Sequence, residues 1–420
     1  MRPTGMEGSM SSSVSESDSP LKVATLLFAT TLVALSGAIV NPVLPAIESA
    51  FPSVPNAGTL AQLVSTLTGL IIAIFAPIIG VIVDRYGRKA VLVGSLALYG
   101  VGPSLAYVAD SLYVILGTRV LLGIAVAGIM VSSTTLIADY YSGKRREKVL
   151  GWQGAIMPFG AAVAVIAGGV IADLNWRTAF LTYLVALLVL PAVVRYIDEP
   201  DRGDKQQAGS IPTWTELREI LSTLPLAFLA ALYLIMFAGM IGYNQINVEI
   251  PFYLRTVTSV GGLMTGVALA AMMIISGVVT MNFDQIRERF DPVVILVGVF
   301  VATGVGFTVT SLTTNYWAIV VGIVIAGTGL GLLLPTTNYW VSARVDEQYR
   351  GRALSGVTTT QFLGMFISPI AVAPLIEMFG TGRTFLVLGA VGLVLAGVFG
   401  AIAVRNQSSL TEATPAGSDG

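Results

Sequence analysis

The sequence predicts an all-α membrane protein whose twelve transmembrane helices form two pseudo-symmetric six-helix bundles. Three observations predict it: the composition, the number of long apolar runs, and a repeat between the two halves. The chain has 420 residues, of which 55% are hydrophobic and 11% are charged. Soluble domains average about 25% charged residues. Because a spanning helix needs about 20 apolar residues, a chain of 420 residues accommodates about twelve of them.

The apolar runs of spanning length fall into two groups of six. The first group, within residues 21–197, comprises residues 21–46, 60–83, 90–109, 112–138, 149–172 and 178–197. The second group, within residues 226–405, comprises residues 226–248, 261–283, 292–312, 316–341, 353–378 and 384–404. The polar linker 198–225 joins them, and its IPTWTELREILSTLP stretch predicts a short amphipathic helix on the membrane surface. Residues 1–20 and 406–420 are polar, and we expect disordered tails there.

The two halves repeat each other at a shift of about 204 residues. Asp84-Arg85-Tyr86 falls on Glu288-Arg289-Phe290, and Arg146 and Gly160 fall on Arg350 and Gly364. Internal repetition of this kind is typical of membrane transporters.

The basic residues set the expected orientation. Apart from Arg119, which lies inside a span, only Arg177, Arg255 and Arg383 fall on the side opposite the termini. All the other Lys and Arg residues lie on the side of the termini. Because Lys and Arg accumulate in cytoplasmic loops, we expect both termini in the cytoplasm and the protein in the plasma membrane.

The composition also excludes several functions. The chain has no Cys and no His, so disulfides and Cys-ligated metals are excluded, and proton coupling would have to use carboxylates. The formal net charge of −1 argues against nucleic-acid binding. We find no metal-ligand cluster, nucleotide motif or phosphate-binding loop, and we expect no metal, no cofactor and no enzymatic activity.

A short basic loop, residues 80–89 (GVIVDRYGRK), separates the second and third predicted spans. It resembles the loop signature of the major facilitator superfamily, Gly-x-x-x-Asp-Arg-x-Gly-Arg-Lys, at every fixed position. The matching residues are Gly80, Asp84, Arg85, Gly87, Arg88 and Lys89. Gly80 and Gly87 are expected to let two helices approach closely. The resemblance implies a transporter that works by alternating access.

The same resemblance suggests a gate on the cytoplasmic side. It implies that the Asp84 carboxylate lies at the N-terminus of a helix from the other half, near residues 354–358, where the helix dipole favours a negative charge. Asp139 is the expected partner of Arg85 or Arg88. The alternative for both acids is a solvated charge with no role in gating.

Two residues of the first half are candidates for substrate or proton coupling. Arg119 lies well inside a span, where a charge usually faces a cavity, and Gly123 follows it as in the fourth helix of the family. The alternative is that Arg119 snorkels to the surface. Asn41, in LSGAIVNPVLP, resembles the first-helix pattern of drug:proton antiporters, although Ser36 stands where that pattern has Asp. Asn41 could equally make an ordinary interhelical hydrogen bond.

The fifth predicted span bears on the direction of transport. Gly151, Gly160, Gly168 and Gly169 match a glycine pattern of exporters, but Ala164 and Val165 replace its Gly-Pro. The pattern favours export, and the alternative is generic close packing of helices.

Polar residues in the second half supply further candidates for the cavity. Polar side chains in lipid must be satisfied by neighbours or by cavity water. The candidates are Tyr243, Gln245, Asn247, Glu249, Asn338 and Gln361. Among the carboxylates Glu249 is the best candidate for a protonation switch, because it follows a polar segment that we expect to be unwound.

The sequence thus favours a monomeric secondary transporter that exports small amphipathic compounds in exchange for protons. The alternatives are an importer, a transporter of a defined nutrient such as a sugar or an organic metabolite, and a non-transporting sensor with the same fold.

Overall fold

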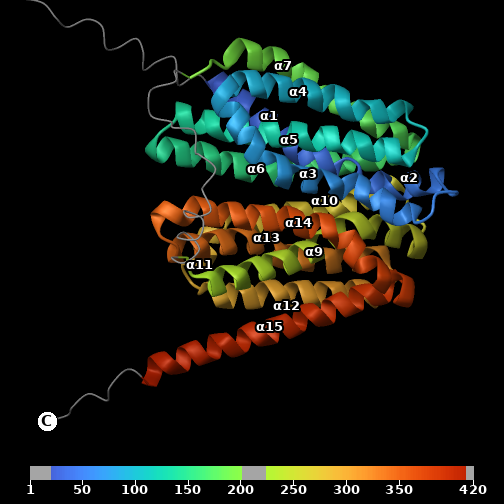
Figure 1. Ribbon diagram of the computed structural model, residues 1–420. Coiled ribbons are helices and arrows are strands. Elements are labelled where there is room, and N and C mark those ends of the chain that lie inside the picture. Colours follow the sequence, from blue (N-terminus) through green and yellow to red (C-terminus); the bar gives the residue numbers. More distant parts are fainter. Residues whose placement is uncertain (1–19, 201–223, 413–420) are drawn as a thin grey trace, which may run out of the picture.

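The computed structural model describes residues 20–200 and 224–412, with side chains described as far as residue 403. Its described residues contain twelve helical stretches that are long and apolar enough to cross a membrane. They form two bundles that lie side by side, with the first half blue to green and the second half yellow to red (Figure 1). The predicted twelve-helix fold is confirmed.

The first half contains α1 (Pro20–Ala38), η1 (Asn41–Val43), α2 (Leu44–Ala50), α3 (Ala57–Tyr86), α4 (Arg88–Ser104), η2 (Leu105–Val108), α5 (Leu112–Tyr140), α6 (Gly143–Leu174), η3 (Trp176–Leu184) and α7 (Val185–Tyr196). The second half contains α9 (Leu226–Val257), α10 (Gly262–Met281), α11 (Phe283–Arg287), α12 (Pro292–Ser311), α13 (Tyr316–Arg344), α14 (Glu347–Phe379) and α15 (Thr381–Glu412).

The first span is interrupted rather than continuous. Pro42 and Pro45 lack the N–H group that would continue the helical ladder. The Val40 N–H turns to the Gly37 carbonyl, and η1 separates α1 from α2. The two prolines therefore account for the break near the end of this span.

The halves pack closely along α6 with α10 and along α3 with α14. At the first of these interfaces a Cβ added to Gly169 would lie 2.4 Å from the Gly262 carbonyl oxygen, and one added to Gly266 would lie 2.6 Å from the Val165 carbonyl oxygen. Glycine is therefore required where these two helices cross.

The ends of several helices differ from the sequence prediction. We predicted an unwound segment before Glu249, but α9 is helical through Pro251 to Val257. Its residues 244–251 are all buried, and packing on every side holds the helix across the proline. Helix α15 continues to Glu412, beyond the predicted start of the C-terminal tail. Most of the predicted N-terminal tail and linker, the amphipathic helix and residues 413–420 lie outside the described residues.

Candidate functional site: polar contacts between the halves

Polar contacts between the two halves gather at one end of the bundle. We call this the far end, and it contains residues 39–58, 173–176 and 249–263 (Figure 1). We call the opposite end the basic end, and it contains residues 80–89 and 139–148. Arg255 of α9 donates hydrogen bonds from Nη1 to the Pro45 carbonyl oxygen at 2.8 Å and to Ser49 Oγ at 2.9 Å. Because these acceptors lie on α2, the two hydrogen bonds join the halves.

A carboxylate makes the second contact at the far end. Asp173, on the last turn of α6, accepts hydrogen bonds from the backbone N–H groups of Gly262 at 2.6 Å and Leu263 at 2.9 Å. These groups open α10, where unsatisfied N–H groups and the helix dipole favour a negative charge. The first half therefore caps a helix of the second half.

Glu249 makes the third contact and is 4% exposed. Its Oε2 accepts a hydrogen bond from Gln62 Nε2 of α3 at 2.5 Å, and its Oε1 accepts one from Thr381 Oγ1 of α15 at 3.0 Å. Among the Asp and Glu residues whose side chains the structure describes, Glu249 alone is buried. Glu249 is thus a buried titratable group that also forms a hydrogen bond between the halves.

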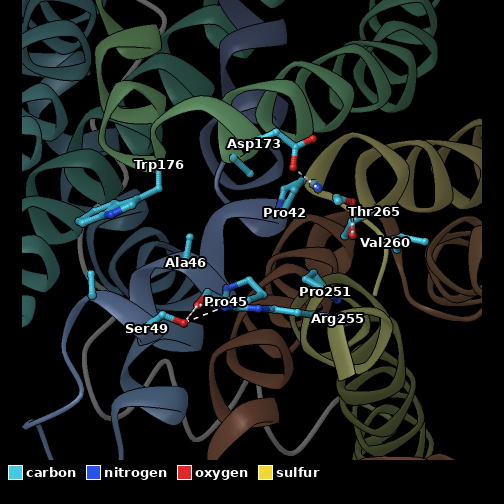
Figure 2. Close-up of a pocket in the computed structure, with 14 residues that line it drawn as sticks. Pro42, Pro45, Ala46, Ser49, Asp173, Trp176, Pro251, Arg255, Val260 and Thr265 are labelled. Carbon is cyan, nitrogen blue, oxygen red and sulfur yellow. Dashed lines mark hydrogen bonds between the residues drawn. The ribbon is translucent and has the colours of Figure 1, made fainter. Parts of the chain in front are cut away.

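A cavity of about 460 Å³ is lined by residues of the Arg255 and Asp173 contacts. Pro45, Asp173 and Trp176 line it from the first half, and Arg255 and Thr265 line it from the second. Figure 2 shows Arg255 extended toward Pro45 and Ser49, with Asp173 directed at the start of α10. The cavity is a pocket at the far end, bridged by hydrogen bonds between the halves.

The basic end is organised differently, because its described contacts stay within the first half. Arg88 is 6% exposed and donates from Nε to Asp139 Oδ2 at 3.0 Å. Glu199 accepts from the backbone N–H groups of Arg88 and Lys89 at 2.8 Å each and caps α4. Gly87 has φ of 102°, a left-handed conformation that favours glycine. Glu199 was not among the predicted site residues, although its position just beyond the sixth span on the basic side was a signal.

The expected partner of Asp84 is not the one observed. We predicted that its carboxylate lies at the N-terminus of a helix from the other half. Its described partner is instead Arg88, four residues along, with Oδ1 at 4.0 Å from Nη2. Within residues 20–200 and 224–403, every hydrogen bond between the halves lies at the far end. The described hydrogen bonds between the halves therefore join them at the far end, and the predicted contact of Asp84 with the second half is not observed.

Arg119 faces neither a cavity nor the surface, so both expectations for it are wrong. It is 0% exposed. Its Nη1 donates to Tyr183 Oη at 3.1 Å and its Nη2 to the Pro103 carbonyl oxygen at 3.3 Å. The guanidinium carbon also lies 4.9 Å from the centroid of the Phe180 ring. This charge is held by neutral acceptors and aromatic rings inside the first half.

The Tyr183 hydroxyl links Arg119 to the end of α1, because it donates to the Ser36 carbonyl oxygen at 2.7 Å. In Tyr183→Phe both hydrogen bonds are lost and buried polar groups are left unsatisfied, which costs about 1–3 kcal/mol. We expect a lower unfolding temperature in detergent, measured by differential scanning fluorimetry. The matched control is Tyr99→Phe, equally buried, which loses only the bond to the Leu32 carbonyl oxygen. Equal losses in both variants would show that Arg119 does not depend on Tyr183.

Several polar residues proposed for substrate or proton coupling are buried and hydrogen-bonded to neighbouring residues. Gln245 donates to the Ser368 carbonyl oxygen at 3.0 Å, and Asn247 donates to the Tyr243 carbonyl oxygen at 2.9 Å. Asn41 accepts from Ser65 Oγ at 2.6 Å, so α1–η1 is bonded to α3. All three side chains are buried. The placement of Gln245 and Asn247 in a cavity is therefore wrong. For Asn41 the structure shows the alternative, an interhelical hydrogen bond. Tyr243 is half-buried on α9.

Asn338 and Gln361 are the cavity candidates that keep free polar atoms. Both side chains are half-exposed, on α13 and α14, and neither makes a hydrogen bond to another described residue. Phe28, on the basic half of α1, is 52% exposed. Amide groups of this kind can bind a substrate, whereas the Gln245 amide could do so only by breaking its hydrogen bonds to Ser368 of α14.

The glycines predicted to pack helices divide into two groups. A Cβ on Gly123 would lie 2.5 Å from Ile71 Cβ, one on Gly160 2.4 Å from Thr31 Cγ2, and one on Gly168 2.1 Å from the Ile39 carbonyl oxygen. These three, and Gly169 at the α10 crossing, are packing positions. Gly80 and Gly151 have no atom within 4 Å of such a Cβ, so the close approach predicted there is wrong.

Twelve apolar helices in two similar halves, joined by polar contacts at one end, define a multi-pass helical membrane protein of the transporter type. The family described as Major Facilitator Superfamily matches residues 26–369 and 286–418. The chain belongs to the Major Facilitator Superfamily.

Comparisons with individual proteins place it among transporters of diverse substrates. It is 31% identical to "Multidrug resistance protein 1" of Bacillus subtilis (strain 168), over 37% of this chain and 42% of that protein. It is 30% identical to "Protein spinster homolog 1" of Homo sapiens, over 48% of this chain and 40% of that protein. The chain thus spans about two fifths of the length of these curated relatives. The solved structure of the nucleoside transporter NupG matches with a TM-score of 0.73 at 13% identity, covering 91% of this chain and 99% of that one, which shows the fold.

Proposed function

We propose that this protein is a secondary active transporter that works by alternating access and exports small amphipathic compounds in exchange for protons. The main support is that the hydrogen bonds between the two halves, among the described residues, all lie at the far end. An alternating-access transporter closes one end while the other is open. On this proposal the structure represents the state closed at the far end, and Asp84 contacts the second half in the opposite state.

Proton coupling is assigned to Glu249. Its carboxylate is buried and accepts a hydrogen bond from Gln62 of the other half. Protonation changes what this carboxyl group can accept and donate, and so changes a contact between the halves. Glu48 is the neighbouring titratable group that acts on it, and Gln62 and Thr381 are its polar partners.

The substrate class rests on the exposed side chains and on the relatives. Asn338 and Gln361 supply neutral amides, and Phe28 supplies an apolar surface, which suits a small amphipathic compound. The glycine pattern of α6 and the similarity to the multidrug resistance protein favour export. The similarity to a "3-(3-hydroxy-phenyl)propionate transporter" of Escherichia coli (strain K12), 28% identical over 36% of each chain, favours the alternative of a defined metabolite.

We also propose an orientation in the membrane, a cellular location and an oligomeric state for the protein. The distribution of Lys and Arg supports a topology with the basic end and both termini in the cytoplasm and the far end outside. We propose the plasma membrane as its location and a monomer as the working unit. A sensor without transport is the second alternative, and flux of any substrate would exclude it.

The test is a flux assay on the purified protein in lipid vesicles with an imposed pH gradient. The substrate probe is a lipophilic cationic dye, which we expect to move in the direction opposite to the protons. Adding the dye should therefore shift the lumenal pH in the opposite direction from the shift that a symporter would cause. Co-directional movement would replace export with import. Screening a pump-deficient host against dyes and antibiotics then narrows the substrate.

A further inference from the structure

One face of α6 carries positive charge at its start and aromatic groups beyond it. Lys144, Lys148, Trp152, Ile156 and Phe159 follow one another at spacings of four, four, four and three residues. Residues at these spacings share one face of a helix. The Lys148 ammonium lies 5.1 Å from the centroid of the Trp152 ring, so the basic and apolar parts of this face are in direct contact.

The apolar part of the face borders a groove between α1 and α6. It has a volume of about 310 Å³ and is lined by Leu27, Trp152, Ala155, Ile156 and Phe159, all apolar. Trp152 is 41% exposed and Phe159 is 36% exposed. The groove therefore begins one helical turn beyond Lys148 and runs into the membrane-spanning part of α6.

The basic part of the face lacks a compensating charge in the described part of the protein. Lys144 and Arg146 lie in the first turn of α6, where the helix dipole disfavours cations. Neither they nor Lys148 forms a salt bridge with a described carboxylate, and Glu147 is the acid within this exposed stretch. A cluster of cations at a helix N-terminus is stabilised by an anionic partner.

We propose that this site binds one anionic phospholipid of the leaflet at the basic end, with the phosphate against Lys144 and Lys148 and one acyl chain in the groove. Charge complementarity selects the headgroup, because cations just outside a spanning helix attract anionic lipids. The groove selects a lipid over a soluble anion, because its lining is apolar apart from the indole N–H of Trp152 and suits an acyl chain. The bound lipid fills the space between α1 and α6, and α6 also carries Asp173 and the contact with α10.

The experiment is native mass spectrometry of the purified full chain titrated with dioleoyl phosphatidylglycerol or dioleoyl phosphatidylcholine. We expect one phosphatidylglycerol to bind at least about tenfold more tightly than phosphatidylcholine. At about 1 kcal/mol per cation, or about fivefold, the double variant Lys144→Gln, Lys148→Gln is expected to lose about 25-fold. Ala155→Phe fills the groove and is expected to weaken binding of phosphatidylglycerol while leaving both lysines in place.

The matched control is the double variant Arg289→Gln, Arg352→Gln, which removes two exposed cations at the basic end of the second half. It is expected to bind phosphatidylglycerol as the unaltered chain does. Three results would overturn the proposal: equal binding of the two lipids, an equal loss in the control, or full competition by millimolar inorganic phosphate.

Discussion

Replacing Glu249 with Gln is expected to abolish the response of transport to a pH gradient. The glutamine keeps a side chain of similar size next to Gln62 and Thr381, so the contact between the halves retains its shape. It cannot take up or release a proton, so the protonation step is lost. Initial rates of dye flux in vesicles should become the same with and without the gradient. The gradient-driven rate should fall at least about tenfold if coupling supplies 1.4 kcal/mol or more.

The neighbouring acid supplies the control for this experiment. Glu48 lies on α2, is half-buried, and is not among the described hydrogen-bond partners of Glu249, which are Gln62 and Thr381. Glu48→Gln should retain gradient-driven flux. If Glu249→Gln still responds to the gradient, proton coupling runs through another group and the role assigned to Glu249 is wrong.

Replacing Asp173 with Ala is expected to shift the protein toward the state that is open at the far end. The substitution removes two hydrogen bonds from a carboxylate to the N-terminus of α10. Hydrogen bonds to charged groups contribute about 1.5–3 kcal/mol each, and the exposure of Asp173 reduces this. A net change of about 1.4 kcal/mol is a tenfold shift in population.

The absence of Cys from the sequence makes this shift measurable by labelling. A single Thr265→Cys places a thiol in the wall of the far-end cavity, where Thr265 is 4% exposed. Its rate of maleimide labelling should rise about tenfold when Asp173→Ala is added. Asp110→Ala is the matched control, because Asp110 is also at the far end but pairs with Arg177 of its own half. Unchanged labelling with Asp173→Ala would show that this carboxylate does not hold the far end closed.

The helices could be predicted from the sequence because the membrane imposes a simple requirement on the chain. Each span must satisfy its own backbone hydrogen bonds and present about 20 apolar residues to lipid. The span predicted at residues 112–138 is α5, Leu112–Tyr140, and that predicted at residues 292–312 is α12, Pro292–Ser311. The errors lie at helix ends, as in α9, where burial rather than local sequence decides how far the helix continues.

The candidate site was harder to predict because it depends on partners distant in the chain. Arg119 and Gln245 were correctly singled out as unusual for a span, but their partners, Tyr183 and Ser368, could not be read from their neighbours. Asp173 and Arg255 carried a weak signal, since charges are scarce on the far side. Nothing in the sequence indicated that Asp173 would cap α10 rather than face water.

The sequence alone determined the class of protein: twelve spans, two related halves and a basic loop that matches a transporter family. The hydrophobic requirement of the bilayer acts on each span separately, so a linear reading is sufficient for it. Which polar groups bind one another was decided only by tertiary structure. Gln62 and Glu249 are 187 residues apart and meet only because α3 and α9 pack across the two halves.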